Sequence, residues 1–562
     1  MTPNVFVIIT DDLGWGDIAA HGNRQLRTPH LDVLRGQSVR LNRYCSGPLC
    51  TPARAALMTG RYPYRTRAID TYQGRSMMDP NEITLAQVLR DHGYTTGIFG
   101  KWHLGDSYPM RAVDRGFEEA VVHNGGGLRQ PANIGRDSYF DPDLMHNGVL
   151  ERYQGYCTDI YADAAIDFIR RHQSHPFLCY LATNAPHDPL EVAERWAGPY
   201  RHAGMPDGIA RLYGMVENID WNVGRVLAAL DQLSLAPRTI VLFASDHGPR
   251  HDPVRFNGGL RDQKTSVYEG GIRAPCFWRW PGRFSAGVDI DRIANPIDVL
   301  PTLAAACGAA MPTDRAIDGV NLLPLLSGQI RPDQWPDRVI CLQWHRGDQP
   351  TPYRNATAVG QRFKWISPAG WEERLHWRSP PFSAPDELYD LPNDPGERQN
   401  LAGTHPDLVA ELRGAYARWF DDVSRTRPDN YAPPRITIGS QAERVTWLTR
   451  QDWRCYEPDH EQRGWGIDNP GFWEVQVARA GAYQISVDLP VLSEPGTLCV
   501  RCGGYAFRQP VQPAEVNAGL ITRMIGPVPL ASGPTRLEAV VERDPAGPAG
   551  RYGVDRVAVA PA

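Results

Sequence analysis

Residues 5–12 read VFVIITDD, an apolar and largely β-branched run that ends in two aspartates. A short continuous apolar run of this kind is typical of a strand that is buried on both faces of a parallel sheet. Three later segments have the same form, a short apolar run followed by polar, Gly-rich or His-rich residues: 95–100, 177–182 and 239–244. These four segments predict the centre of a parallel sheet.

Helical patterns lie between the predicted strands, at 85–92, 160–172 and 214–233. Alternation of strands and helices predicts a doubly wound α/β sheet. The stretch 424–434 is polar and Pro-rich, and beyond it the apolar residues alternate with polar ones. Because a period of two is typical of antiparallel strands, we predict a β-sandwich at 435–562.

Composition excludes several classes of protein. The chain has 562 residues, of which 42% are hydrophobic and 22% charged, with 59 Lys and Arg against 64 Asp and Glu. This balance argues against binding to nucleic acid or anionic membranes through bulk charge. No apolar run is long enough to span a membrane. Residues 1–10 lack a signal-peptide pattern, so we expect a cytoplasmic protein, or a periplasmic or secreted one if a leader has been removed.

The cysteines do not indicate a disulfide framework. Ten Cys are spread along the chain without a repeating spacing. Cys499 and Cys502 form a single CxxC with no second pair, so we expect strand cysteines there rather than a zinc or redox site. We expect most of the cysteines to be buried thiols.

Charged side chains and imidazoles follow all four predicted strands. In a doubly wound sheet, ligands bind at the carboxyl ends of the strands, where the loops converge. Carboxylates gathered there repel one another unless a counter-ion is present, and hard oxygen ligands suit Ca²⁺ or Mg²⁺. The alternative for Asp11 and Asp12 is a turn or a helix cap. The residues at these strand ends are Asp11 and Asp12, Lys101 and His103, His187, and Asp246 and His247.

Residues 50–61 read CTPARAALMTGR. This segment resembles the signature of the formylglycine-dependent sulfatases of the alkaline phosphatase superfamily. The resemblance implies that a formylglycine-generating maturation enzyme oxidises Cys50 to an aldehyde, which hydrates to a diol. One hydroxyl would attack sulfur, and loss of a proton from the other would expel sulfate. Ala53 stands where the family often has Ser, which affects recognition by the maturation enzyme. The alternatives are a buried Cys before a helix-starting Pro and a Cys45–Cys50 disulfide.

Further blocks extend the resemblance over about residues 1–430. They are GKWHLG at 100–105, GGLRDQK at 258–264, EGGIRAP at 269–275 and the stretch 388–402. The implied fold is a doubly wound mixed sheet of the alkaline phosphatase type with a smaller C-terminal antiparallel subdomain. We therefore expect a catalytic α/β domain at 1–330, an α+β subdomain at 331–430 and the appended β-sandwich.

The resemblance also implies roles for individual residues. The metal, usually calcium with Mg²⁺ as the alternative, would be held by Asp11, Asp12, Asp246, His247 and Cys50. His247 stands where the family often has Asn. The catalytic set would add Arg54 and Lys101 to hold nucleophile and sulfate, His103 to take the proton from the spare hydroxyl, and His187 and Lys264 on the leaving-group side. Taken singly, each could be a packed His or a solvated Lys.

Three long polar segments, 121–156, 250–261 and 343–354, are rich in His, Arg and aromatic residues. Such loops are typical of a sugar-binding mouth, with solvated loops as the alternative. The leading hypothesis is a sulfatase acting on a sulfate monoester of a carbohydrate. The alternatives are a phosphonate or phosphate ester hydrolase of the same superfamily and a non-catalytic carbohydrate-binding protein. Candidate substrate contacts are His123, Arg129, Arg250, His251, His345 and Arg346.

Overall fold

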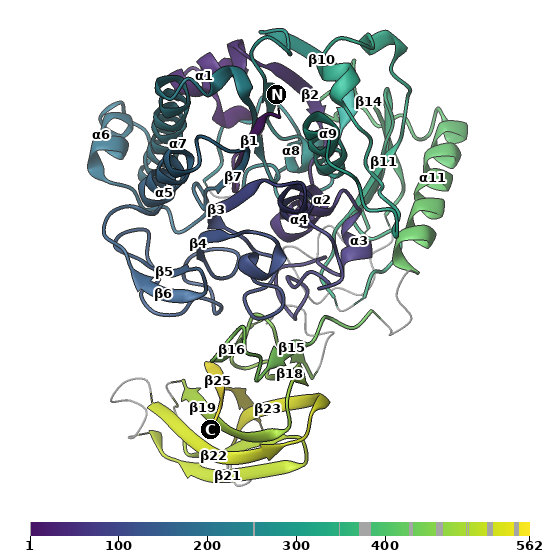
Figure 1. Ribbon diagram of the computed structural model, residues 1–562. Helices are drawn as coiled ribbons and strands as arrows, with labels where there is room; N and C mark the ends of the chain where they lie inside the picture. Colours follow the sequence, from purple (N-terminus) through teal and green to yellow (C-terminus); the bar gives the residue numbers. More distant parts are fainter. Residues whose placement is uncertain are drawn as a thin grey trace.

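The computed structural model describes residues 2–250, 253–347, 349–369, 384–425, 431–456, 465–490, 492, 494–513, 521–543 and 550–562. Figure 1 shows a large α/β body, built by the N-terminal part of the chain, and a smaller body of strands built by the C-terminal part. None of the described helices combines the length and the apolar character that a membrane span requires.

Within these residues, ten strands form the main sheet, in the order β10-β2-β9-β8-β1-β7-β3-β4-β5-β6. β1 pairs in parallel with β7 and β8, and β7 pairs in parallel with β3, which confirms the predicted centre of the sheet. β9 is antiparallel to both of its neighbours, so the sheet is mixed. The bounds are β1 Asn4–Thr10, β2 Val39–Tyr44, β3 Thr95–Lys101, β4 Glu119–His123, β5 Asp143–His146, β6 Val149–Arg152, β7 Phe177–Ala182, β8 Thr239–Ser245, β9 Cys276–Arg279 and β10 Val288–Ala294.

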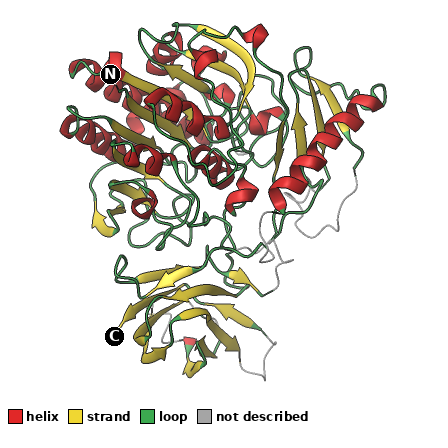
Figure 2. Cartoon of the chain, turned by 45° about the vertical axis from the view of Figure 1, so that its right-hand side comes forward, coloured by secondary structure: helices red, strands yellow, loops and turns green. Residues whose placement is uncertain are grey.

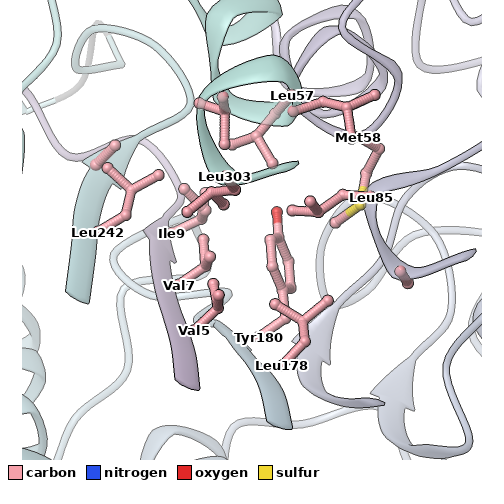
Figure 3. Packing of buried hydrophobic residues seen from close by; sticks show 14 of the residues in the cluster. Val5, Val7, Ile9, Leu57, Met58, Leu85, Leu178, Tyr180, Leu242 and Leu303 are labelled. Atoms are coloured by element: carbon pink, nitrogen blue, oxygen red, sulfur yellow. The ribbon is translucent and has the colours of Figure 1, made fainter. Parts of the chain in front are cut away.

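Helices cover both faces of this sheet because alternate residues of each strand point to opposite sides. Val5, Val7 and Ile9 of β1 pack in one cluster with Leu57 and Leu303, as Figure 3 shows. Phe6 and Ile8 point the other way, into a second cluster. The helices of the first face are α2 (Cys50–Thr59), α4 (Leu85–Asp91) and α9 (Val299–Cys307), and those of the second are α1 (Pro29–Gly36), α5 (Cys157–Arg171) and α7 (Asp207–Gln232).

A second, antiparallel sheet is formed by β11 (Ile340–Gln343), β12 (Ala356–Val359), β13 (Phe363–Ser367) and β14 (Glu387–Asp390). The long helix α11 (Pro406–Ser424) packs on it, with the rings of Tyr416 and Trp365 5.3 Å apart. This is the smaller subdomain that the resemblance implied. Shorter helices are α3 (Pro63–Thr66), α6 (Glu194–His202), α8 (Glu269–Ile272) and α10 (Leu323–Leu326).

Two sheets with a shared apolar core make up the C-terminal body, which confirms the predicted β-sandwich (Figure 2). One sheet has the order β15-β18-β23-β20-β21, with β17 on β18 and β24 on β23, and the other has the order β16-β25-β19-β22. The bounds are β15 Ile436–Ile438, β16 Thr446–Thr449, β17 Arg454–Cys455, β18 Gly471–Val477, β19 Gly481–Leu489, β20 Gly496–Cys502, β21 Tyr505–Val511, β22 Ile521–Leu530, β23 Gly533–Arg543, β24 Arg551–Gly553 and β25 Arg556–Pro561.

The cysteines agree with the sequence analysis. All ten fall within the described residues, and all are buried free thiols. Cys499 and Cys502 lie on β20, as expected of strand cysteines. Cys45 and Cys50 are not bridged.

The exact domain boundaries, at residues 330/331 and between 430 and 435, stay predictions.

Candidate active site

Cys50 is the first residue of α2 and is buried. The positive end of the helix dipole therefore lies at its thiol. Burial alone raises the pKa of the Cys50 thiol, but the charges of Lys101 and Lys264 outweigh burial and lower this pKa below its usual value. The Cys50 sulfur also lies within 4.8 Å of ligand atoms of Asp11 and His247. The predicted nucleophile position is thus in contact with the predicted metal site.

Three buried carboxylates converge beside Cys50. Asp11 and Asp12 follow β1 and Asp246 follows β8, and these two strands are parallel neighbours with Thr10 opposite Ser245. One oxygen of each carboxylate forms an ion pair with a basic side chain. Lys101 Nζ lies 2.6 Å from Asp11 Oδ2, Lys264 Nζ lies 2.5 Å from Asp12 Oδ1, and Arg54 Nη2 lies 2.9 Å from Asp246 Oδ2. Although burial raises the pKa of Asp11 and Asp12, the two lysines hold both pKa values below the usual range.

The second oxygen of each of these carboxylates has no hydrogen-bond partner among the described residues, and neither has His247 Nε2. This nitrogen lies 3.7 Å from Asp11 Oδ1, 3.5 Å from Asp12 Oδ1 and 3.4 Å from Asp246 Oδ1. Buried polar atoms are costly unless something binds them, and oxygen-rich sets of this kind suit a hard divalent cation. The residues present therefore fit the metal that the resemblance implied.

His103, which follows β3, and His187, which follows β7, pack against a glycine loop that follows β4. A Cβ atom on Gly126 would be 2.3 Å from His103 Cε1, and one on Gly127 would be 2.9 Å from His187 Cε1. Both ring nitrogens of His103 lack a partner in the described structure. Burial, followed by the charges of Lys101 and Arg54, holds the pKa of His103 well below its usual value, so the imidazole is neutral. The sequence analysis did not single out Gly126 and Gly127. The signal in the sequence was the run of three glycines at 125–127.

Of the candidate substrate contacts, three lie near this centre. His123 is buried at the end of β4, and its Nε2 has no partner among the described residues. Arg250 Nη1 lies 2.6 Å from Asp188 Oδ1, next to His187. The charge of Cys50 is among the causes that raise the pKa of Arg346, so this guanidinium lies within electrostatic range of Cys50.

The other three candidates differ. Arg129 is largely exposed and forms an ion pair with Glu191. Both ring nitrogens of His345 are engaged inside the protein, Nδ1 with Arg346 O and Nε2 as the acceptor of Thr351 N–H at 2.8 Å. Any role of His345 at the substrate would therefore be indirect. His251 lies outside the described residues.

The structure adds aromatic residues that the sequence analysis did not single out. Trp344 packs with Leu49 and Cys50. Arg346 Cζ lies 5.0 Å from the centre of the Trp344 ring and 4.3 Å from that of Tyr72. Tyr72 in turn meets the edge of Trp465, a β-sandwich residue, at 6.0 Å between ring centres. A series of contacts therefore connects Cys50 to residues of all three predicted domains.

Comparison with known families matches residues 3–309 to the family described as Sulfatase. The chain belongs to the sulfatase family. A second match, over residues 259–414, is to the family described as N-sulphoglucosamine sulphohydrolase, C-terminal. Together the two matches cover the main sheet and most of the smaller subdomain, and they assign the enzyme to the sulfuric ester hydrolases.

Curated relatives of this sulfatase act on different molecules, according to their names. The steryl-sulfatase of Mus musculus is 31% identical over 544 residues, which cover 77% of this chain and 84% of the mouse protein. The N-acetylgalactosamine-6-sulfatase of Homo sapiens is 33% identical over 375 residues, which cover 62% of this chain and 69% of the human protein. Identity at this level supports the enzyme class, but it does not determine the substrate, because relatives of similar identity are named for different substrates.

Among solved structures, Ps i-CgsB in complex with k-i-k-neocarrahexaose superimposes with a TM-score of 0.66 at 26% identity. The match covers 77% of this chain and 94% of that chain. The fold is accordingly the mixed α/β fold of the sulfatases of alkaline phosphatase type, with the β-sandwich appended to it.

Proposed function

We propose that this sulfatase hydrolyses a sulfate monoester of a carbohydrate, with Cys50 matured to formylglycine as the nucleophile and a divalent cation beside it. One observation carries the proposal. Three buried carboxylates next to Cys50 each pair one oxygen with a basic side chain and leave the other oxygen without a partner in the described structure. A divalent cation held there would fill this gap and would supply positive charge toward a sulfate.

Asp11, Asp12, Asp246 and His247 are the residues that would hold the cation. When bound, it supplies charge neutralisation for the sulfate and for the oxygen nucleophile. We favour Ca²⁺ over Mg²⁺ because the unpaired donors come from the protein itself, whereas Mg²⁺ usually keeps several of its waters. Oxidation and hydration of the Cys50 side chain supply one hydroxyl for attack on sulfur and a second one for release of the product.

The basic residues have different roles in the proposed reaction. Arg54 and Lys101, anchored on Asp246 and Asp11, hold the nucleophile and the sulfate oxygens. His103 is neutral and its ring nitrogens are unpaired in the described structure, so it is able to take a proton from the nucleophile side chain during sulfate release. Lys264 and His187 lie at Asp12, where they stabilise the leaving alkoxide.

A carbohydrate is the substrate class that the surroundings favour. Arg250 is paired with Asp188 and Arg346 with Asp70, and such neutral pairs offer several hydrogen-bond donors and acceptors to hydroxyl groups. Trp465 and the buried Tyr72 add aromatic side chains from two domains. The oligosaccharide bound to Ps i-CgsB supports the same class, whereas the name of the mouse relative points to steroids.

Mass spectrometry of the peptide that contains residue 50 tests the proposal, on protein produced together with a formylglycine-generating enzyme. We expect an aldehyde at Cys50, turnover of sulfated sugars, and at least a thousandfold loss of turnover in Cys50→Ala with an unchanged circular dichroism spectrum. Unmodified Cys50 in fully active protein contradicts the mechanism. Faster hydrolysis of a phosphate ester than of its sulfate counterpart contradicts the assignment to sulfate esters.

A further inference from the structure

A second group of oxygen atoms, from one half-buried and two buried side chains, lies where the β-sandwich meets the catalytic domain. Asp106 comes from the loop after β3, and Gln451 and Asp452 follow β16, which faces the catalytic domain in Figure 1. Asp106 and Asp452 line one cavity of about 500 Å³ between the two bodies. Gln451 is 0% exposed and Asp452 is 4% exposed. This group is separate from the active-site carboxylates.

The side chains of this group converge on Gly125. The Gly125 N–H donates to Asp106 Oδ2 at 2.9 Å. A Cβ atom on the same glycine would lie 2.8 Å from Gln451 Oε1. The amide oxygen of the β-sandwich and the carboxylate of the catalytic domain therefore approach one backbone position from two sides. Burial is the largest cause that raises the pKa of Asp106, and the charge of Asp452 is the second. The two carboxylates are therefore close to each other.

Polar atoms of Gln451 and Asp452 lack partners. Gln451 Oε1 and Nε2 and Asp452 Oδ1 have no hydrogen-bond partner in the described structure. A buried amide or carboxylate without a partner is costly, so we expect a ligand to bind these atoms. Gln451 is uncharged, so charge repulsion between the two carboxylates does not explain why its amide is unpaired.

No basic side chain of the described chain neutralises Asp106 or Asp452. Arg111 and Arg444 line the same cavity, and neither forms an ion pair with Asp106 or Asp452 among the described residues. Arg111 is held by Asp114 at 2.8 Å and lies 3.6 Å from Glu443. The groups that shift the pKa of Asp106 and Asp452 include no cation at all. Two neighbouring carboxylates thus remain uncompensated at the interface.

We propose that a divalent cation that prefers oxygen ligands, best matched by Ca²⁺, binds between Asp106, Gln451 and Asp452 and joins the β-sandwich to the catalytic domain. Ca²⁺ accepts carboxylate and amide oxygens together with waters, for which the cavity has room. The site also acts on the active-site loop, because Gly125 is followed by Gly126, against which His103 packs. The cation would therefore hold this loop at Gly125, one residue before the glycine that packs against His103.

Calcium content of the full-length enzyme tests the proposal. After removal of metal by a chelator, we expect equilibrium dialysis against Ca²⁺ to give two bound ions per chain. Asp452→Asn should retain one ion, whereas the matched control Asp114→Asn, whose carboxylate pairs with Arg111 next to the site, should retain two. Asp12→Asn should also retain one ion, because it weakens only the active-site metal. Circular dichroism checks that each variant is folded.

Several outcomes overturn the inference. It fails if Asp12→Asn binds no calcium, or if Asp452→Asn binds as much as the unmodified enzyme. It also fails if Asp106→Asn raises the melting temperature without any change in calcium content, because that result means that protons or water, and no metal, occupy the interface. If Asp452→Asn does not fold, Gln451→Leu is the second variant, with the same expected loss of one ion.

Discussion

Lys101 Nζ lies 2.6 Å from Asp11 Oδ2, and both side chains are completely buried. The pair joins the ends of β3 and β1, which are separated in the sheet by β7. Removal of one partner from a buried ion pair leaves an uncompensated charge, which is far more costly than the loss of a surface pair. The same contact therefore contributes to the stability of the sheet edge and to the arrangement of the nucleophile.

Lys101→Met should lower both activity and stability. The free energy of unfolding should fall by about 3 kcal/mol, because Asp11 then stays charged without a buried partner. Urea denaturation and kcat/KM for a sulfated sugar measure the two effects. Lys101→Arg keeps the charge and should lose activity with a smaller loss of stability. Equal stability of Lys101→Met and the unmodified enzyme contradicts this account.

Gly126→Ala should impair catalysis without unfolding the enzyme. The added methyl group would meet the His103 ring at 2.3 Å, so the imidazole must move. We expect kcat to fall at least about tenfold, because small displacements of a catalytic group are costly. Gly36→Ala is the matched control, since a Cβ atom there has no heavy atom within 4 Å, and its kcat should be unchanged. An unchanged kcat in Gly126→Ala contradicts the assignment of His103 to proton transfer.

Removal of the active-site metal should destabilise the enzyme. Asp11, Asp12 and Asp246 then repel one another, and a ligand at a hundred times its Kd stabilises by about 2.7 kcal/mol. We expect a chelator to abolish turnover and to lower the melting temperature by several degrees, with Ca²⁺ restoring both more effectively than Mg²⁺. The Asp452→Asn background isolates the active-site ion from the proposed interface ion. Full activity in the presence of the chelator contradicts the metal site.

His345 should make stability depend on pH below neutrality. Burial lowers the pKa of His345 to about 4, and Nε2 must stay unprotonated to accept from Thr351. The unfolded chain takes up this proton near pH 6.5 but the folded chain does not, so stability is lost as the pH falls from 6.5 toward 4. From pH 6.5 to pH 5, His345 should cost about 1.5 kcal/mol.

Urea denaturation at both pH values, for the unmodified enzyme and for His345→Gln, isolates this effect from other titrating groups. Glutamine provides an acceptor and a donor without a titrating ring, so the pH slope should be shallower by about the same amount. Identical slopes in the two proteins contradict the assignment of a neutral imidazole.

The strands of the main sheet were predictable because their signal is local. A strand buried on both faces is a continuous apolar run, and 95–100, 177–182 and 239–244 each lie within the observed strand. β9 was not predicted. Its four residues carry no alternation, and its antiparallel direction depends on packing between β8 and β2.

The convergence of the candidate site residues was predictable, whereas their individual contacts were less so. Asp11, Asp12 and Asp246 stand directly after strands, and the carboxyl ends of neighbouring parallel strands must meet. The engagement of His345 with Thr351 was not predictable, because it depends on the shape of a turn. The approach of Trp465 to Tyr72 depends on how the β-sandwich docks.

The amino-acid sequence by itself determined the sulfatase signature at Cys50, the order of the central strands along the chain and the residue types that end them, because each is written in a short contiguous segment. Only the tertiary structure decided which carboxylate oxygens remain unpaired, which glycines press on His103 and His187, and how Gln451 reaches Gly125. These contacts join segments that are distant in sequence, and a hydrogen bond or a steric contact exists only once packing has brought its atoms within a few ångströms.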